Sequence, residues 1–375
     1  MDNYLAITDY IIPFLVTFVL AIIITWLVRK FALKKNIVDK VDESGRKIHR
    51  RDTPLLGGNA IFFSVLIVTL VYAIFSDRLI GGYLMPKYLW AIFIGGGLLM
   101  IGGYLDDKLS LKPAKQVIWP ILAVLVIITG GIGVSYITNP VGGTYDLESI
   151  QFKIFEINNI PYYFVLLADI FAFVWLMGMM YTTKFLDGLD GLVSGITTIG
   201  AFVLFFLSIT QEVAQPETAL LSVILAGAAL GFLVFNFYPA KIFLGEGGSL
   251  FTGFMLGVLS IISGAKIATA LLIMGIPILD VLWVIIRRIF IEKKSPFSTA
   301  DNKHLHFRLL DIGLSHRQAV ILLYFISIVF GGVALIFSGK DKLIALIALI
   351  IFMVLLGLWV VIKYHKKIKQ QEYEK

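Results

Sequence analysis

Residues 162–181 (YYFVLLADIFAFVWLMGMMY) and 189–209 (LDGLVSGITTIGAFVLFFLSI) are two apolar stretches joined by the short polar link TTKFLDG at 182–188. Each stretch is long enough to cross a bilayer as a helix, which takes roughly 17–25 residues. Carboxylates beside such spans are costly to keep next to lipid, so Asp187 and Asp190 need a compensating cation or ligand. The stretches predict a helical membrane protein, and the acidic link predicts where its chemistry lies.

The rest of the chain follows the same pattern, with 58% hydrophobic and 15% charged residues. We predict an all-α, polytopic integral membrane protein that forms a single transmembrane domain over residues 1–375. About eleven windows qualify as transmembrane helices: Ile7–Val28, Leu55–Ala73, Tyr88–Leu105, Val117–Ile137, Tyr162–Tyr181, Leu189–Ile209, Ala219–Phe237, Ser249–Ser263, Ala265–Ile286, Gln318–Phe337 and Leu343–Ile362. The eighth window is short and bounded by glycine, so about ten spans is the alternative count.

Basic residues are distributed unevenly between the two sides of the predicted membrane domain. If the N-terminus lies outside, the inner side holds all five histidines and all but six of the 32 lysines and arginines. The six exceptions are Arg78, Lys87, Lys153, Lys266, Lys340 and Lys342. The positive-inside rule therefore places the N-terminus outside and the C-terminus in the cytoplasm. We expect the membrane to be the cell (cytoplasmic) membrane. The same bias accounts for the net charge of +7, so we expect no nucleic-acid partner.

The absence of cysteine and the charges around the first apolar segment further restrict the kinds of site and of N-terminal segment that the chain can have. The chain has no cysteine, which excludes disulfides, iron–sulfur clusters and thiolate metal sites. The first apolar segment has its basic residues after it, which indicates an uncleaved anchor. On the outer side, the loop 138–161 is expected to form a small hairpin.

Three acidic segments on the inner side place carboxylates at the membrane boundary. Asp106 and Asp107 end the third span, where two adjacent anions need a metal, a lysine or a shared proton. Asp187 and Asp190 are spaced i, i+3, which puts both carboxylates on one face of a helical turn. Glu246 stands among glycines at a helix start, where a metal and backbone N–H groups can meet one phosphate. Such oxygen ligands suit Mg²⁺ or Mn²⁺, whereas solvated helix ends and plain turns are the structural alternatives.

Two basic segments lie on the same side. The loop RKIHRRDTPLLGGN at 46–59 leads into a Gly-Gly helix start that favours an anion, although a plain positive-inside cluster is the alternative. The loop DNKHLHFRLL at 301–310 lacks the further ligands of a zinc site, so phosphate and sugar binding is the better interpretation of its histidines. Metal-binding carboxylates beside basic clamps are typical of phosphoryl transfer on a lipid head group.

A transporter or lipid flippase is the rival class, and it should carry ionisable groups near the middle of the membrane. Asp169 and Asp280 are the two acidic residues within predicted spans. Asp169 lies toward the outer side, where a structural role and a functional one are equally open. Asp280 approaches Arg287, so we assign it to the inner site. The charges therefore favour an enzyme over a transporter.

These segments together resemble the polyprenyl-phosphate N-acetylhexosamine-1-phosphate transferases, which share a superfamily with phospho-N-acetylmuramoyl-pentapeptide translocase. The resemblance rests on the loop 46–58, the aspartate pair 106–107, the DGLDGL motif at 187–192, the segment 236–249 and the DNKHLHFRLL loop. It implies transfer of a sugar-1-phosphate from a UDP-sugar such as UDP-GlcNAc to a polyprenyl phosphate such as undecaprenyl phosphate, with Mg²⁺ and release of UMP. It also allows a homodimer. An inactive relative that binds nucleotide-sugar is a further alternative.

The resemblance also implies roles for individual residues. Asp106 or Asp107 would act as acid/base or orient the nucleophile, Glu246 would bind the metal, and Asp187 and Asp190 would support metal and nucleotide. The implied substrate-binding residues are Lys47, His49, Lys112, Lys115, Lys184, Asn236, Lys303, His304, His306 and Arg308. The active site would be built from the loops 29–54, 105–116, 182–190, 237–249 and 287–317.

The chain departs from the family pattern at three positions. Glu246 stands where the family usually has aspartate, so its carboxylate reaches one methylene further. Lys184 stands where asparagine is usual, which adds a positive charge. Phe307 replaces the second histidine of the family's His-His step.

Overall fold

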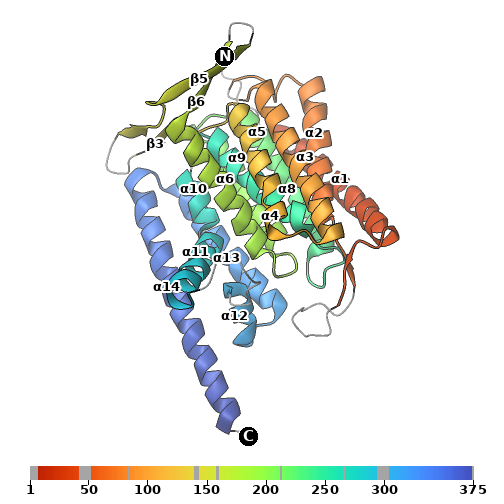
Figure 1. Cartoon of the computed structure of the whole chain (residues 1–375), viewed down its shortest axis with the longest axis vertical. Coiled ribbons are helices and arrows are strands. Elements are labelled where there is room, and N and C mark those ends of the chain that lie inside the picture. The colour runs from red at the N-terminus through yellow and green to blue at the C-terminus, as the bar shows by residue number, and fades with distance from the viewer. Residues whose placement is uncertain are drawn as a thin grey trace.

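The computed structural model describes residues 7–41, 52–82, 84–138, 143–157, 160–211, 213–264, 267–293 and 304–373. In this part of the chain, long helices run side by side as a bundle, and hairpins of short strands lie at one end (Figure 1). The expected all-α, polytopic architecture is confirmed, since eight of the described helices are long and apolar enough to cross a membrane.

Most helices begin within a few residues of an apolar window, but the fourth window, Val117–Ile137, was too long: its helix ends at Thr129 and its last two residues lie in a strand. The helices are α1 (Ile7–Lys34), α2 (Gly57–Phe75), α3 (Pro86–Leu109), α4 (Pro113–Gln116), α5 (Ile118–Thr129), α6 (Leu166–Leu186), α7 (Leu192–Ser208), α8 (Pro216–Asn236), α9 (Gly245–Ile262), α10 (Ile267–Ile273), α11 (Gly275–Ile286), the π-helical turn η1 (Arg287–Ile291), α12 (Leu305–Asp311), α13 (His316–Ile336) and α14 (Gly339–Tyr373).

The predicted spans that are not among the eight long helices also coincide with apolar helices. Two are shorter helices, Pro113–Thr129 and α7. Another is a broken pair, because α10 and the segment Pro277–Phe290 meet at an angle of 82°. The window that we placed at Ser249–Ser263 begins at Gly245, so Glu246 lies within the first turn of α9.

The outer loop differs from the prediction of one small hairpin. Two antiparallel hairpins form: β3 (Tyr136–Thr138) pairs with β4 (Thr144–Asp146), and β5 (Gln151–Ile157) pairs with β6 (Ile160–Val165). The fifth span consequently begins at Leu166 and not at Tyr162. Aromatic and β-branched residues favour strands as well as apolar spans, so hydropathy alone misassigned the first residues of that window.

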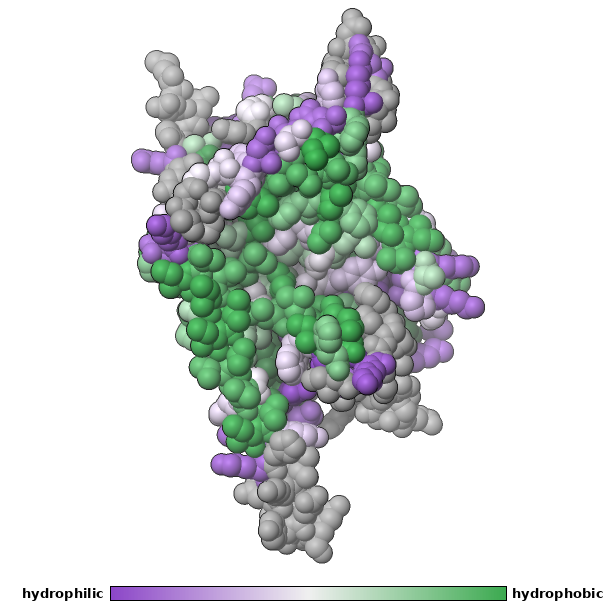
Figure 2. Space-filling view, turned by 60° about the vertical axis from the view of Figure 1, so that its left-hand side comes forward, coloured by the Kyte–Doolittle hydropathy of each residue, from purple (hydrophilic) through white to green (hydrophobic). Residues whose placement is uncertain are grey.

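The centre of the bundle is α9. The buried share of its apolar window is 94%, against 22% for α1 and 17% for α14. It contacts α2, α3, α6 and α7. In the orientation of Figure 2, hydrophobic side chains cover most of the flank of the helices, as expected for a surface that faces lipid. A short two-stranded sheet, β1 (Val38–Asp39) with β2 (Thr53–Pro54), connects α1 to α2.

Glycines bring two helices against the first turn of α9. A Cβ atom at Gly58 of α2 would overlap the Cα of Gly248, and a Cβ atom at Gly103 of α3 would overlap the Cα of Gly247. Small residues allow such close approach between helices in lipid, where apolar burial alone gives little drive to associate. The contacts place Glu246 beside the last turns of α3.

Candidate functional site

The predicted inner loops gather at the end of the bundle opposite the β5–β6 hairpin, where α4 and α12 lie (Figure 1). We call this the site end: residues 105–116, 182–192, 236–249 and 304–317. Three carboxylates from distant parts of the chain meet there. The backbone N–H of Glu246 donates to Oδ1 of Asp107 at 3.1 Å, across 139 residues of sequence. Asp187 interacts electrostatically with both. We call Asp107, Asp187 and Glu246 the carboxylate cluster.

Asp187 is the open member of the carboxylate cluster. It follows the last residue of α6, and its side chain remains in contact with solvent. Desolvation by the surrounding protein raises the pKa of Asp187 to about 8, and repulsion from Glu246 and Asp107 adds to the shift. Within the described residues, no group donates a hydrogen bond to this carboxylate. A cation bound beside Asp187 would lower this pKa and hold the carboxylate in its ionised form.

Asp106 has a different environment from its neighbour Asp107. Oδ1 of Asp106 accepts the backbone N–H of Leu111 and the Nε2 of Gln116, both at 2.9 Å. Nε2 of Gln116 also donates to the carbonyl of Leu111 at 3.0 Å. Asp106 thus holds the turn between α3 and α4. Sequence reasoning missed Gln116, because nothing in the residues around it marks it as a site residue.

Lys184 lies in the last turn of α6 and joins the carboxylate cluster. Its Nζ forms an ion pair with Oε1 of Glu246 and donates to Oε1 of Gln116 at 3.1 Å. The two charged side chains are largely buried, with 20% and 15% of their surfaces exposed. The predicted substrate-binding lysine is therefore paired with the predicted metal-binding carboxylate.

Asp190 and Asn236 brace the loops of the site end. Oδ2 of Asp190 accepts the backbone N–H of Ala240 at 2.9 Å. Asn236 accepts the N–H of Gly191 at 3.1 Å, and its Nδ2 donates to the carbonyl of Ile242 at 3.0 Å. The structure thus places the predicted substrate-binding Asn236 in internal hydrogen bonds that join two loops. Both the oxygen and the nitrogen of its side-chain amide are therefore engaged by partners within the chain.

The two histidines of the predicted basic loop, His304 and His306, lie against the end of α6 and the loop that follows it. Nδ1 of His304 lies 2.9 Å from Oδ2 of Asp280, whose Oδ1 accepts the N–H of Leu305 at 2.8 Å. The rings of His304 and His306 stack with centroids 5.6 Å apart. His306 packs against Gly188, since a Cβ atom there would overlap its Nε2. Asp280 of α11 therefore contacts the site end, in agreement with its assignment to the inner side.

His306 is a buried and neutral group. It is 1% exposed, and neither ring nitrogen has a hydrogen-bond partner in the described part of the chain. Desolvation lowers the pKa of His306 to about 3, so the ring is uncharged at neutral pH. A neutral imidazole offers one N–H donor and one acceptor to a ligand.

The remaining predicted residues contribute less to this geometry. Lys112 and Lys115 are exposed around α4, and Arg308 is partly exposed on α12. The predicted site residues Lys47, His49 and Lys303 lie outside the residues that the structure describes.

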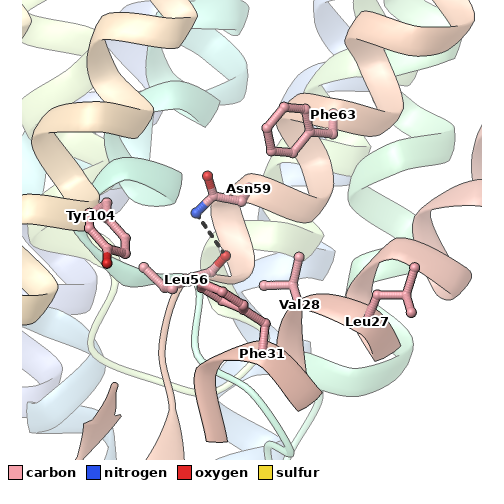
Figure 3. Close-up of a pocket in the computed structure, with 7 residues that line it drawn as sticks. All are labelled: Leu27, Val28, Phe31, Leu56, Asn59, Phe63 and Tyr104. Carbon is pink, nitrogen blue, oxygen red and sulfur yellow. Dashed lines mark hydrogen bonds between the residues drawn. The ribbon is translucent and has the colours of Figure 1, made fainter. Parts of the chain in front are cut away.

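A separate apolar pocket adjoins the carboxylate cluster. It encloses about 360 Å³ between α1, α2 and α3 (Figure 3) and is lined by Leu27, Val28, Phe31, Leu56, Asn59, Phe63 and Tyr104. Asn59 donates to the carbonyl of Leu56 at 3.2 Å, and the backbone N–H of Leu56 lies near Asp107. The lining is mostly apolar, so the pocket suits an apolar group and not a nucleotide.

The carboxylate cluster supplies the kind of oxygen donors that a divalent ion takes. Its ligands would be the oxygens of Asp187 and Glu246, with Asp107 beside them, and Mg²⁺ prefers such hard donors. Among the described residues, no group of three or more histidine, aspartate or glutamate side chains is placed to hold a metal ion by itself. Mg²⁺ sites that act on phosphates commonly use one or two carboxylates, with water and phosphate as the other ligands.

Comparisons with known proteins agree with this chemistry. The family model described as glycosyl transferase family 4 matches residues 89–264. A probable undecaprenyl-phosphate N-acetylglucosaminyl 1-phosphate transferase of Bacillus subtilis is 30% identical over 352 residues, covering 92% of this chain and 90% of that protein. A decaprenyl-phosphate N-acetylglucosaminephosphotransferase of Mycolicibacterium smegmatis is 32% identical over 336 residues, covering 82% and 79%. A phospho-N-acetylmuramoyl-pentapeptide-transferase of Oceanobacillus iheyensis is 30% identical over 337 residues, covering 86% and 96%.

Proposed function

We propose, because this chain belongs to glycosyl transferase family 4, that it transfers an N-acetylhexosamine-1-phosphate from a UDP-sugar to a polyprenyl phosphate. The products would be a polyprenyl-diphosphate-sugar and UMP, in the first membrane step of cell-envelope glycan synthesis. The observation that carries the proposal is the meeting of Asp107, Asp187 and Glu246 beside the basic and histidine side chains of one end of the bundle. The names of the similar bacterial proteins supply the substrate classes.

The reaction would be a direct displacement at phosphorus. An oxygen of the acceptor phosphate forms a bond to the β-phosphorus of the donor, and the bond from that phosphorus to the bridging oxygen breaks. The electron pair leaves with UMP. A phosphate monoester has a second pKa near 6, so the acceptor is largely deprotonated at neutral pH. A strong general base is unnecessary, and positioning and electrostatics carry most of the barrier reduction.

The residues of the site end would divide these tasks. Asp187 and Glu246 would hold a Mg²⁺ or Mn²⁺ ion, which when bound neutralises charge on the non-bridging oxygens. Asp107 is fixed by the N–H of Glu246, and it would orient the acceptor phosphate through the bound ion, because a bare carboxylate repels a phosphate anion. The neutral His306 would donate a hydrogen bond to the donor's diphosphate or sugar.

The orientation of the chain follows from the positive-inside bias. Most lysines and arginines fall on the side of the site end, so we place this end in the cytoplasm and the β3–β6 hairpins outside. A UDP-sugar is a soluble cytoplasmic donor, and the polyprenyl phosphate reaches the same boundary from the inner leaflet.

The two acids within spans give the transporter alternative no support. Oδ2 of Asp169 accepts the N–H of Val165 at 2.8 Å and holds the start of α6 beside the hairpins. Asp280 pairs with His304 at the other end of the bundle. Both carboxylates thus have hydrogen-bond partners, and they lie near opposite ends of the bundle rather than at its middle.

The test uses the purified full chain with radiolabelled UDP-GlcNAc, polyprenyl phosphate and Mg²⁺. We expect a lipid-soluble product with an equal amount of UMP, and loss of both when EDTA removes the metal. Asp187→Asn and Glu246→Gln should each lower kcat by about 10²–10³, the usual effect of removing one group that stabilises transition-state charge. Glu148→Gln, on the exposed outer loop, is the matched control. If the wild-type chain forms no product from any of a panel of UDP-sugars, the transferase proposal is wrong and the inactive-relative alternative gains.

A further inference from the structure

Lys184 lies where it competes with a divalent ion for one carboxylate. Its ammonium is paired with Oε1 of Glu246, a member of the carboxylate cluster. An ammonium provides three N–H donors and a single positive charge, whereas Mg²⁺ needs the same oxygen lone pairs at short distance. The two cations cannot share this oxygen at full strength, so binding of one weakens binding of the other.

A second contact gives the ammonium a place to stay when it leaves Glu246. Oε1 of Gln116 accepts from Nζ of Lys184 at 3.1 Å. The other end of this amide is fixed, because its Nε2 donates to Asp106 and to the carbonyl of Leu111. Gln116 therefore keeps its oxygen turned toward Lys184. The ring of Tyr181, 5.6 Å from Nζ, adds a weak cation–π contact on another side.

Burial of the ion pair explains why one cation should replace the other at Glu246. Both side chains of the ion pair are at least four-fifths buried, and a partly desolvated carboxylate without a counter-ion is costly. Glu246 thus needs a cation in every state of the site. The lysine supplies it when no metal is bound, and the metal supplies it afterwards.

We propose that Lys184 is a built-in counter-ion of the metal site, which a divalent cation displaces from Glu246 and which then contacts the diphosphate of the donor. The second half of this proposal rests on the proposed transferase function, whereas the first half concerns metal binding alone. The side-chain lengths suit the exchange, since both the lysine and the glutamate are long enough to move while their backbones stay in α6 and α9. Lys184 acts in this scheme as a positioning residue for the metal and as a ligand for the donor.

The first test measures metal affinity without any substrate. Mn²⁺ is titrated into the purified full chain in detergent, and free Mn²⁺ is followed by electron paramagnetic resonance. Lys184→Met should bind Mn²⁺ about tenfold more tightly than the wild-type chain, because the competing cation is gone. Lys184→Arg keeps the charge and should bind no more tightly than the wild-type chain. Lys108→Met removes an exposed lysine at the same end and should leave the affinity unchanged.

The second test asks for an opposite effect on the donor. The KM of Lys184→Met for the UDP-sugar should rise about tenfold, while Lys184→Arg stays close to the wild-type value. A merely structural role would weaken metal and donor binding together. If Lys184→Met does not fold, Lys184→Gln replaces it, because its amide can still reach Glu246 and Gln116.

Mn²⁺ affinity that is unchanged or weaker in the neutral variant, at an unchanged melting temperature, overturns the proposal. So does a failure of both the wild-type chain and the neutral variant to bind Mn²⁺. The proposed function can fail separately. If the wild-type chain binds Mn²⁺ more weakly than Lys184→Met but forms no lipid product, the counter-ion proposal stands and the transferase proposal is wrong.

Discussion

Gly188 and His306 are in direct contact, with the imidazole packed so closely on the glycine that a Cβ atom would overlap its Nε2. The contact joins the acidic loop after α6 to the first turn of α12. It packs a neutral imidazole on the residue that directly follows Asp187 in the chain.

Gly188→Ala should therefore displace His306 and impair the reaction. The backbone φ of Gly188 is not in the left-handed region, so the added methyl acts through the overlap and not through backbone strain. Overpacking of this kind costs typically about 1–3 kcal/mol. We expect kcat/KM for the UDP-sugar to fall at least about tenfold, measured by UMP release. Gly178→Ala is the matched control, since a Cβ atom at that position meets nothing within 4 Å. Equal activity of the two variants would contradict the role of this contact.

His306 should also make stability depend on pH in a defined window. Its pKa is lowered from 6.5 to about 3 by burial, so between these values the unfolded chain binds a proton that the folded chain does not. Stability from this group is complete above pH 6.5 and falls as the pH is lowered, by at most about 1.4 kcal/mol per pH unit. The melting temperature of the wild-type chain should drop more steeply from pH 6.5 to 4.5 than that of His306→Gln. Parallel pH profiles would show that His306 is not buried in its neutral form.

Asp280 should be needed for both the stability of the site end and donor binding. Its carboxylate holds Nδ1 of His304 and the N–H of Leu305, at 2.9 and 2.8 Å. Asp280→Ala removes both buried contacts, and hydrogen bonds to a charged group contribute about 1.5–3 kcal/mol each. We expect a melting temperature lower by several degrees and a higher KM for the UDP-sugar. Asp311→Ala, an exposed aspartate at the end of α12, serves as the control. If Asp280→Ala has the wild-type KM for the UDP-sugar, His304 does not contribute to donor binding.

The glycine contacts of α9 should decide whether the bundle forms. Gly103→Ala places a Cβ atom onto the Cα of Gly247, where only backbone can give way. We expect a large loss of folded protein or a clearly lower melting temperature, measured by size-exclusion chromatography and thermal denaturation in detergent. Gly97→Ala lies in the same helix, and its Cβ atom would meet Phe62 at 4.0 Å, an ordinary contact. That variant should behave like the wild-type chain, and similar melting temperatures for both variants would argue against the close packing.

Most of the fold was predictable because hydropathy is a local property. Each span depends on residues that are neighbours in sequence, so α1, α8 and α14 could be recognised without any knowledge of their partners. The hairpin strand β6 was missed for the same reason, since its apolar residues satisfy a strand and a span equally well. The bend between α10 and α11 has no local signal beyond Gly275 and Pro277.

The site was predictable as a set of residues but not as a set of contacts. The acidic motifs could be assigned to one boundary, since topology follows from the order of the spans and the positive-inside bias. The prediction that Asn236 contacts substrate differs from its internal bonds to Gly191 and Ile242. A residue that binds substrate and a neighbouring residue that only holds the loops together cannot be told apart in sequence, because both are polar residues of the same loop.

The sequence by itself determined that the chain is a helical membrane protein and that its acidic motifs and histidines lie at one end, because hydropathy and charge can be read directly along the chain. Only the tertiary structure decided that Glu246 meets Lys184 and that Asp280 meets His304. Such contacts depend on how α3, α6 and α9 approach one another. That approach is set by glycine packing between distant segments and not by the residues next to each partner.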